Sequence, residues 1–173
     1  VLDRAKGTAL DMASPGGSAR LRALVEEEVA RWSADHKRGL RSFDLADPDT
    51  PLLDQLLSAF LHVTDHHESD RELARSFFKE LLFVDEPVRS NVSEIMRGYF
   101  LGFGEVIEEA KRRGKLDPEV PVMALVNNLF AAWYLTMQRR HTDTITITQA
   151  KSQLRSAFAT ALMGITPKPG SPP

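Results

Sequence analysis

Apolar residues recur every three or four positions along almost the whole chain, which is the spacing of a helix with one buried face. Strand signals are nearly absent. The segment TITIT at 144–148 alternates, but a short strand without a partner is not stable. We therefore expect an all-α helical bundle of about seven helices. The pattern places them at residues 1–13, 18–37, 51–64, 70–84, 88–113, 118–140 and 149–163.

Capping and stop signals indicate where several of these helices begin and end. Thr50 and Asp117 each precede a proline, so each is expected to cap a helix whose first residue is that proline. Gly114 and Gly164 follow apolar-periodic segments and are expected to end helices, because glycine readily adopts the left-handed backbone of a helix end.

The predicted sixth helix carries no formal charge from Val120 to Gln138 and has two adjacent asparagines, Asn127 and Asn128, in its centre. Such a helix could span a membrane, lie inside the protein or be shared between two subunits. A membrane span is disfavoured because the run is short and its polar side chains would lack partners in a bilayer. A helix that is apolar nearly all round is surrounded by protein, part of which could be a second subunit.

The two asparagines point about 100° apart on a helix and therefore belong to different faces. Asn127 shares its face with large side chains such as Phe130, so we expect it to point toward a ligand or an internal polar partner. Asn128 shares its face with small residues such as Ala124, so we expect it to bond near or across a subunit boundary.

Composition narrows the class of protein. The chain has 173 residues with 42% hydrophobic and 27% charged residues, which suits one globular domain. The formal net charge of −2 does not favour a nucleic-acid surface, and the lack of cysteine rules out disulfides and thiolate metal sites. We expect a cytoplasmic protein with one domain over 1–165 and a disordered, proline-rich tail over 166–173.

No pattern of catalytic or metal-ligating residues is complete. His62 and His66 lie one helical turn apart, but a zinc site needs three or four ligands, so metal binding there would be adventitious. No histidine has a glutamate three residues before it, which excludes the Glu-x-x-His pairs of di-iron bundles. Phosphate-loop, dinucleotide and serine-hydrolase motifs are also absent. We expect no enzyme activity, catalytic residue, metal site or cofactor, and a metal-dependent enzyme using these histidines stays as a minor alternative.

Aromatic and sulfur-containing side chains concentrate in the predicted fourth, fifth and sixth helices. Taken singly, each of them is expected to fill the core. As a set with a few polar tips, they are typical of a small-molecule pocket between helices. The expected ligand-binding residues are Phe77, Leu81, Met96, Tyr99, Phe100, Phe103, Met123, Asn127, Phe130 and Tyr134.

The segment EVIEEAKRRGKLDPEVPVMALVNNLFAAWYLTMQ (105–138) resembles part of the C-terminal domains of TetR-family transcriptional repressors. In that family a long helix ends in a basic–Gly–apolar turn, and a D-P-E start leads into a long apolar helix. AKSQLRSAFATALMGI (150–165) is similar to the family's last helix, and VLDRAKGTAL (1–10) to the exit from its DNA-binding module. The family's helix-turn-helix module has no counterpart here, so we expect that something N-terminal is missing.

The resemblance implies a ligand-sensing, dimerising regulatory domain. A small apolar or aromatic effector between the helices would shift the connection to the missing module, change the spacing of two recognition helices and weaken operator binding. The last two helices would pair with those of a second subunit, and their small residues allow close helix approach. The expected dimer contacts are Ala124, Asn128, Ala131, Leu135, Leu154, Phe158 and Leu162.

The alternative is a helical protein–protein interaction module with a filled core and no small-molecule ligand. A dimer in solution and a closed apolar cavity would favour the regulatory domain. The lack of any cavity would favour the interaction module.

Overall fold

The computed structural model describes residues 2–3, 8–9, 23, 26–27, 30–31, 50–80 and 86–165. Its helices and strands are β1 (Leu2–Asp3), β2 (Thr8–Ala9), α2 (Leu52–Ser69), α3 (Arg71–Glu80), α4 (Glu86–Arg112), α5 (Val122–His141) and α6 (Ile147–Leu162). The all-α class is confirmed. The described residues contain five full helices, however, and not the seven that the periodicity predicts.

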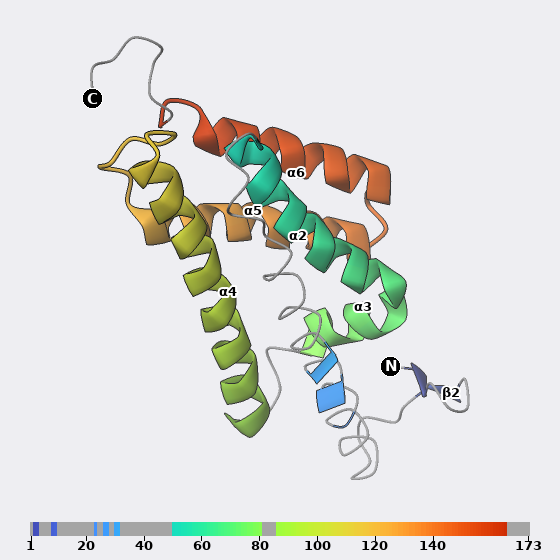
Figure 1. Cartoon of the computed structure of the whole chain (residues 1–173). Helices are drawn as coiled ribbons and strands as arrows, with labels where there is room; N and C mark the ends of the chain where they lie inside the picture. Colours follow the sequence, from blue (N-terminus) through green and yellow to red (C-terminus); the bar gives the residue numbers. More distant parts are fainter. Residues whose placement is uncertain are drawn as a thin grey trace.

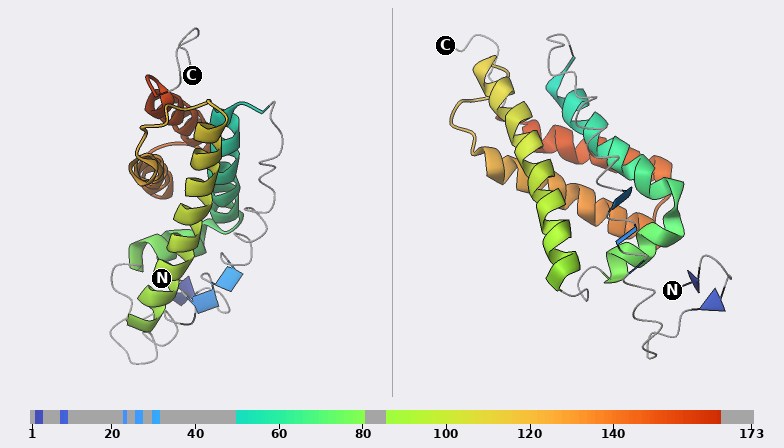
Figure 2. Two further views of the ribbon diagram at one scale, coloured as in Figure 1. Left: turned by 60° about the vertical axis from the view of Figure 1, so that its left-hand side comes forward. Right: turned by 60° about the horizontal axis from the view of Figure 1, so that its bottom comes forward.

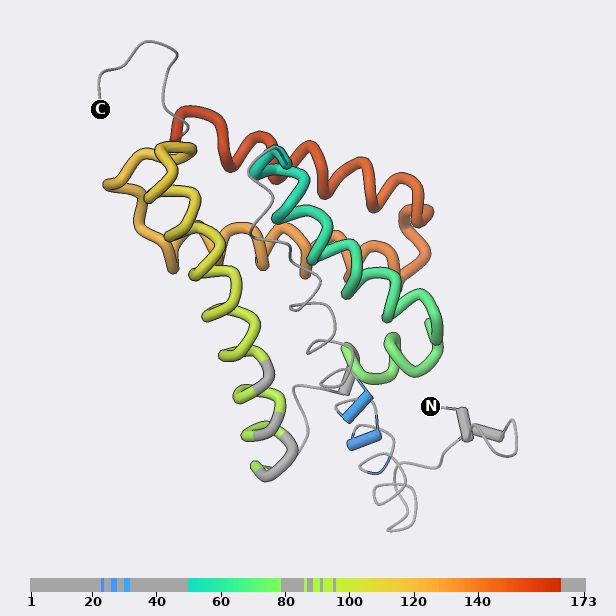
Figure 3. The backbone as a smooth tube through the Cα atoms, in the orientation of Figure 1, coloured from blue at the N-terminus to red at the C-terminus, as the bar shows by residue number. Residues whose placement is uncertain are grey.

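The five helices form a bundle (Figure 1). Helices α5 and α6 form an antiparallel hairpin, and α2 packs along α6. Helix α4 packs mainly on α5, and its first turns extend beyond the other helices (Figure 3). Helix α3 folds back after α2 and lies beside the last turn of α5, as the right-hand view of Figure 2 shows. No described helix is long and apolar enough to cross a membrane.

Four aromatic side chains from four helices meet at the centre of the bundle. Phe60 of α2 stacks on Phe103 of α4 with ring centroids 4.4 Å apart, and it meets the edge of Phe158 of α6 at 4.9 Å. Trp133 of α5 lies 6.1 Å from Phe60. All four are buried. Truncating such a side chain to alanine typically costs about 3–5 kcal/mol, so this cluster contributes strongly to the packing of the four helices.

The N-terminal part of the chain differs from the prediction. Residues 1–13 are predicted to end a helix, but Leu2–Asp3 and Thr8–Ala9 pair as antiparallel strands. A pairing this short depends on its surroundings and has no clear pattern in the sequence. Residues 23, 26–27 and 30–31 are helical, as expected for the predicted helix over 18–37, and the rest of that helix lies outside the described residues.

Helix α5 begins later than predicted. Asp117 accepts the backbone N–H of Glu119 at 2.8 Å and so closes a short turn, but it does not cap the long helix. The helix begins at Val122, after Pro121. A proline lacks the N–H that a helix interior needs and keeps the residue before it out of helical geometry. The predicted stops are confirmed at Gly114 and Gly164, which have φ angles of +66° and +80°.

Helix α2 is longer than predicted. The predicted apolar stripe ends at Thr64, within the polar segment HVTDHHESD (62–70), which is expected to run from a helix end into an exposed loop, but the helix continues to Ser69. His66 and His67 are buried in its last turns, where they pack against other aromatic rings. Polar composition is therefore a poor guide here, because tertiary contacts bury side chains that usually occur in exposed loops.

Candidate functional site

A small apolar cavity lies between α2, α4 and α5. Each of these helices contributes large side chains, so the cavity depends on how all three pack. Eight residues line it, and we call the space they enclose the aromatic cavity: Phe60, Val63, Met96, Tyr99, Phe100, Phe103, Phe130 and Trp133.

Ring contacts hold the walls of the aromatic cavity together. Phe100 of α4 meets the edge of Phe130 of α5 at 5.2 Å, and Phe130 lies 5.5 Å from Trp133. Tyr99 stacks with Phe103 one turn further along α4, with centroids 6.3 Å apart. Such aromatic pairs contribute roughly 0.5–1.5 kcal/mol each beyond their buried area. These contacts therefore oppose separation of the cavity walls. No lining residue is charged, so a ligand would not need a charged group to bind there.

The aromatic cavity is small. The volume open to the centre of a water-sized sphere is about 10 Å³. One water molecule needs roughly 10–15 Å³ by that measure, and drug-sized ligands occupy pockets of roughly 300–1,000 Å³. A ligand larger than a water molecule would therefore need the surrounding helices to separate.

Five of the ten predicted ligand residues line this cavity. They are Met96, Tyr99, Phe100, Phe103 and Phe130. Phe77 is buried beside Phe78 but outside the lining, and Tyr134 packs on Phe78 and Phe130 with its hydroxyl accepting a hydrogen bond from Gln138. Leu81 lies outside the described residues.

Two predicted ligand residues on α5 do not face the cavity. Asn127 is exposed, and Met123 is 45% exposed. The face of α5 that turns inward carries Phe130 and Trp133. Asn127 lies about 120° around the helix from Trp133, which explains its exposure. The sequence pattern grouped Asn127 with the aromatic residues because it lies only about 60° around the helix from Phe130. That places it at the edge of the inward face, where the structure leaves it exposed.

Helix α5 also carries an exposed face that has no charged residue before Arg139. Ala124, Asn128, Ala131 and Leu135 lie along it, and Leu135 is 63% exposed in the single chain. Gln153, Ser156 and Thr160 continue this surface on α6, beside α5, where Arg139 donates a hydrogen bond to Gln153 at 3.1 Å. We call these seven residues the uncharged face.

Three of the predicted dimer residues on α6 do not belong to the uncharged face. Leu154, Phe158 and Leu162 are buried inside the single chain, against α2 and α5. Their stripe is apolar because it forms the core of one chain. A stripe of this kind cannot be distinguished by periodicity from one that packs against a second copy. The predicted dimer residues on α5, by contrast, are all exposed.

The histidines do not form a metal site in the part of the chain that the structure describes. His62 is exposed whereas His66 is buried, so the two do not share an open surface. No group of three or more possible ligands is close enough to hold a metal ion among these residues. Instead, His67 packs 5.4 Å from His66 and 6.2 Å from His141, between the rings of Phe78 and Trp133.

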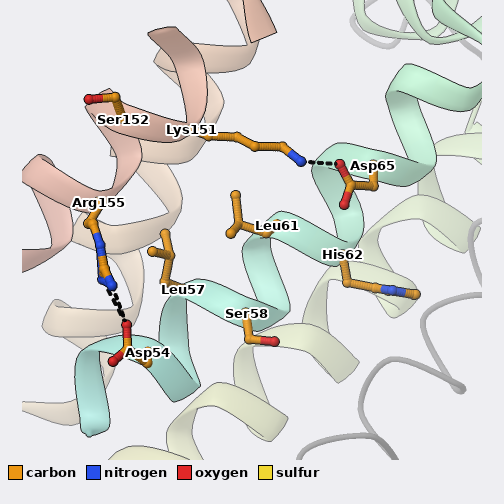
Figure 4. A pocket seen from close by; sticks show the side chains of 9 residues that line it. All are labelled: Asp54, Leu57, Ser58, Leu61, His62, Asp65, Lys151, Ser152 and Arg155. Carbon is orange, nitrogen blue, oxygen red and sulfur yellow. Dashed lines mark hydrogen bonds and ion pairs between the residues drawn. The ribbon is translucent and has the colours of Figure 1, made fainter. Parts of the chain in front are cut away.

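An open groove runs between α2 and α6 on the surface, with a volume of about 710 Å³ (Figure 4). Leu57 and Leu61 lie between two ion pairs that cross it. Arg155 contacts Asp54 at 2.7 Å, and Lys151 contacts Asp65 at 2.7 Å. The charges in the groove therefore neutralise each other. Exposed pairs of this kind contribute about 0–1 kcal/mol each, so they align the two helices more than they stabilise them.

Phe60, Val63 and Trp133 line the aromatic cavity, but the sequence does not single them out as ligand residues. Phe60 belongs to the apolar stripe of α2, and Trp133 to the aromatic set of α5. Both patterns are equally typical of a filled core. Only the crossing of α2 with α4 and α5 shows that these side chains meet, and no local signal in the sequence sets that crossing.

No protein-family model matches the chain, and no curated protein matches it. Among solved structures, the chain is similar to a protein with unknown function from Rhodococcus sp. RHA1. The two share 14% sequence identity with a TM-score of 0.62, over 96% of this chain and 80% of the other. At this identity the similarity shows a shared fold alone.

Proposed function

We propose that the chain is the ligand-sensing and dimerising part of a transcriptional regulator of the TetR kind. One observation carries the proposal: α5 lines the aromatic cavity on one side and bears most of the uncharged face on the other. A ligand that moves α5 would therefore act directly on a subunit boundary. In this proposal a cytoplasmic homodimer reads operator DNA through an N-terminal helix-turn-helix module, to which none of the residues described above belongs.

The dimer follows from the chemistry of the uncharged face. Its small residues, Ala124 and Ala131, let a second helix approach closely, and Leu135 supplies apolar area. Asn128 lies in the middle of this face, where a polar side chain can fix the register of two helices. A twofold axis through the face would pair α5 and α6 with their copies as a four-helix bundle.

The effector class follows from the lining. The aromatic cavity has no charged residue, so a neutral apolar or aromatic molecule fits its chemistry. Such a molecule cannot enter a space of about 10 Å³ without displacing α4 from α5. Binding would therefore select a more open arrangement of these helices, which is how a ligand shifts a two-state equilibrium.

The small volume of the cavity also favours a second candidate function. A helical interaction module with a filled core would show the same aromatic contacts and need no effector. The two candidates differ in what an apolar compound does to the protein.

A thermal-shift screen with neutral aromatic compounds separates them. The regulator binds at least one compound and gains stability by RT ln(1 + [L]/Kd), about 2.7 kcal/mol at a hundredfold excess over Kd. Val63→Leu adds one methylene inside the cavity and should weaken that binding about tenfold. Val92→Leu makes the same change at a buried site of α4 outside the lining and should not. Equal effects of both variants would place the ligand elsewhere.

Light scattering tests the dimer. Leu135→Glu introduces a charge on the uncharged face and should raise the dimer dissociation constant at least about tenfold, because a buried unpaired charge is costly. Leu101→Glu is the matched control, since Leu101 of α4 is also exposed, at 58%, and lies off that face. A wild-type monomer at micromolar concentration would overturn the dimer.

A further inference from the structure

Three arginines gather where α3 meets the end of α5. Arg71 and Arg75 come from α3, and Arg140 from the last turn of α5. All three contact a single carboxylate, that of Asp143. An ion pair between two helices needs only one guanidinium group for each carboxylate, whereas three contact Asp143 here.

The contacts around Asp143 are those of a bound anion. Its Oδ1 accepts a hydrogen bond from Nη2 of Arg71 at 2.6 Å, and its Oδ2 accepts one from Nη2 of Arg75 at 2.7 Å. Nη1 of Arg140 lies 3.5 Å from Oδ1. The side chain of Asp143 is still 60% exposed, so solvent and solutes reach the same cluster. These hydrogen bonds, Arg71 first, lower the pKa of the Asp143 carboxyl.

A second carboxylate holds the deepest of the three arginines in position. Glu68 of α2 contacts Nη2 of Arg140 at 2.8 Å, and the Arg140 side chain is only 11% exposed. Glu68 also lies near Arg71, with its Oε1 3.8 Å from Nε of Arg71. One carboxylate from α2 therefore holds two of the three arginines in position.

The backbone of Asp143 is in an unusual conformation. Its φ angle is +57°, in the left-handed region that residues with side chains rarely adopt. The peptide N–H groups of Asp143 and Thr144 donate to the carbonyls of Arg140 and Arg139, which closes the turn after α5. This turn places the Asp143 carboxylate against the arginines.

The positive field of the cluster is not fully neutralised. The ring of His141 lies beside it. Burial lowers the pKa of His141 most, and the positive charges of Arg71, Arg75 and Arg140 lower it further, whereas Asp143 raises it. Asp143 and Glu68 together place two negative charges against the three positive charges of Arg71, Arg75 and Arg140, which leaves one positive charge. An oxyanion with two charges and more acceptor oxygens fits three guanidinium groups better, because arginine binds phosphate in a bidentate manner.

We propose that Arg71, Arg75 and Arg140 form a binding site for a small dianionic oxyanion, such as phosphate or a phosphate monoester, which the Asp143 carboxylate occupies in this structure. The ligand takes the place of the Asp143 carboxylate on the three arginines. This site is separate from the aromatic cavity and does not depend on the proposed regulatory function.

Calorimetric titration with inorganic phosphate at constant ionic strength tests the site in the full chain. Asp143→Gly removes the competing carboxylate and suits the left-handed backbone. We expect it to bind phosphate at least about tenfold more tightly than wild type. Adding Arg75→Gln to this variant should abolish the gain, because Arg75 contacts no other carboxylate among the described residues. Adding Arg112→Gln, at an exposed site of α4, should leave it intact.

Three outcomes would overturn the proposal. The first is equal affinity of Asp143→Gly and wild type for phosphate. The second is a gain that survives Arg75→Gln. The third is binding to vesicles that contain phosphatidate but not to free phosphate, which would make the cluster a membrane contact. If Asp143→Gly does not fold by circular dichroism, Asp143→Asn serves in its place, because asparagine tolerates this backbone and removes the charge.

Discussion

The indole N–H of Trp133 donates a hydrogen bond to the hydroxyl of Thr64 at 3.1 Å, which joins α5 to α2. The Thr64 hydroxyl in turn donates to the carbonyl of Phe60 at 2.8 Å. Both side chains are buried, so this chain of bonds satisfies polar atoms behind the aromatic cavity. It also fixes the orientation of Trp133, whose ring forms one of the cavity walls.

Thr64→Val should destabilise the protein by about 1–3 kcal/mol, because it keeps the shape but leaves the Trp133 N–H buried without an acceptor. Urea unfolding measures the change in the free energy of unfolding. Thr136→Val is the matched control: Thr136 is buried and bonds its own helix at the Ala132 carbonyl, but it accepts from no tryptophan. Equal losses in the two variants would mean that the Trp133 bond contributes nothing of its own.

Acid should destabilise the fold through its buried histidines. Burial, followed by the charges of Arg71, Arg75 and Arg140, lowers the pKa of His141 to about 4. Burial is also the largest cause that lowers the pKa of His67. In the unfolded chain histidine takes a proton near pH 6.5. Between pH 6.5 and about 4 the unfolded chain therefore binds more protons, so the free energy of unfolding falls as the pH falls.

His141→Leu should reduce this pH dependence. The variant should be about as stable as wild type at pH 7, since the ring nitrogens of His141 make no hydrogen bond among the described residues. It should lose less stability than wild type between pH 6.5 and pH 4, as thermal melts across that range would show. Parallel curves for the two proteins would mean that His141 does not contribute to the acid sensitivity.

Thr146→Ala should cost about 1 kcal/mol, because it breaks the capping box at the start of α6. The Thr146 hydroxyl accepts the backbone N–H of Gln149, and the Gln149 side chain accepts the backbone N–H of Thr146. Thr148→Ala, two residues on and exposed, should be neutral or slightly stabilising because alanine favours helix. Thermal unfolding compares them, and an equal loss in both variants would contradict a specific cap.

The two asparagines of α5 should differ in the proposed dimer. Asn128 lies within the uncharged face, whereas Asn127 is exposed about 100° further around the helix. Asn128→Lys should therefore raise the dimer dissociation constant at least about tenfold, and Asn127→Lys should change it less. Analytical ultracentrifugation measures both. A larger effect at Asn127 would place the subunit boundary on the other side of α5.

The pattern of apolar residues predicts most helices well but not their limits. It places α4 within two residues of its observed ends, because a long stripe and a glycine stop agree there. It places the start of α5 four residues early, because Asp117 and Pro118 form a capping signal that a turn uses instead. It ends α2 before His66 and His67, because their burial depends on rings from α3 and α5 that are distant in sequence.

The sequence by itself determined the all-α class, the aromatic character of the interior and the lack of charge from Val120 to Gln138, because each follows from residue type and spacing. Only the tertiary structure decided which face of α5 packs inside the bundle and which lies at the surface. It turned Phe130 and Trp133 inward and left both asparagines at the surface. It also brought Arg71 and Arg75 to Asp143, 72 and 68 residues away. Helix crossing angles and rotations set such contacts, and they arise from packing between distant segments that no local pattern encodes.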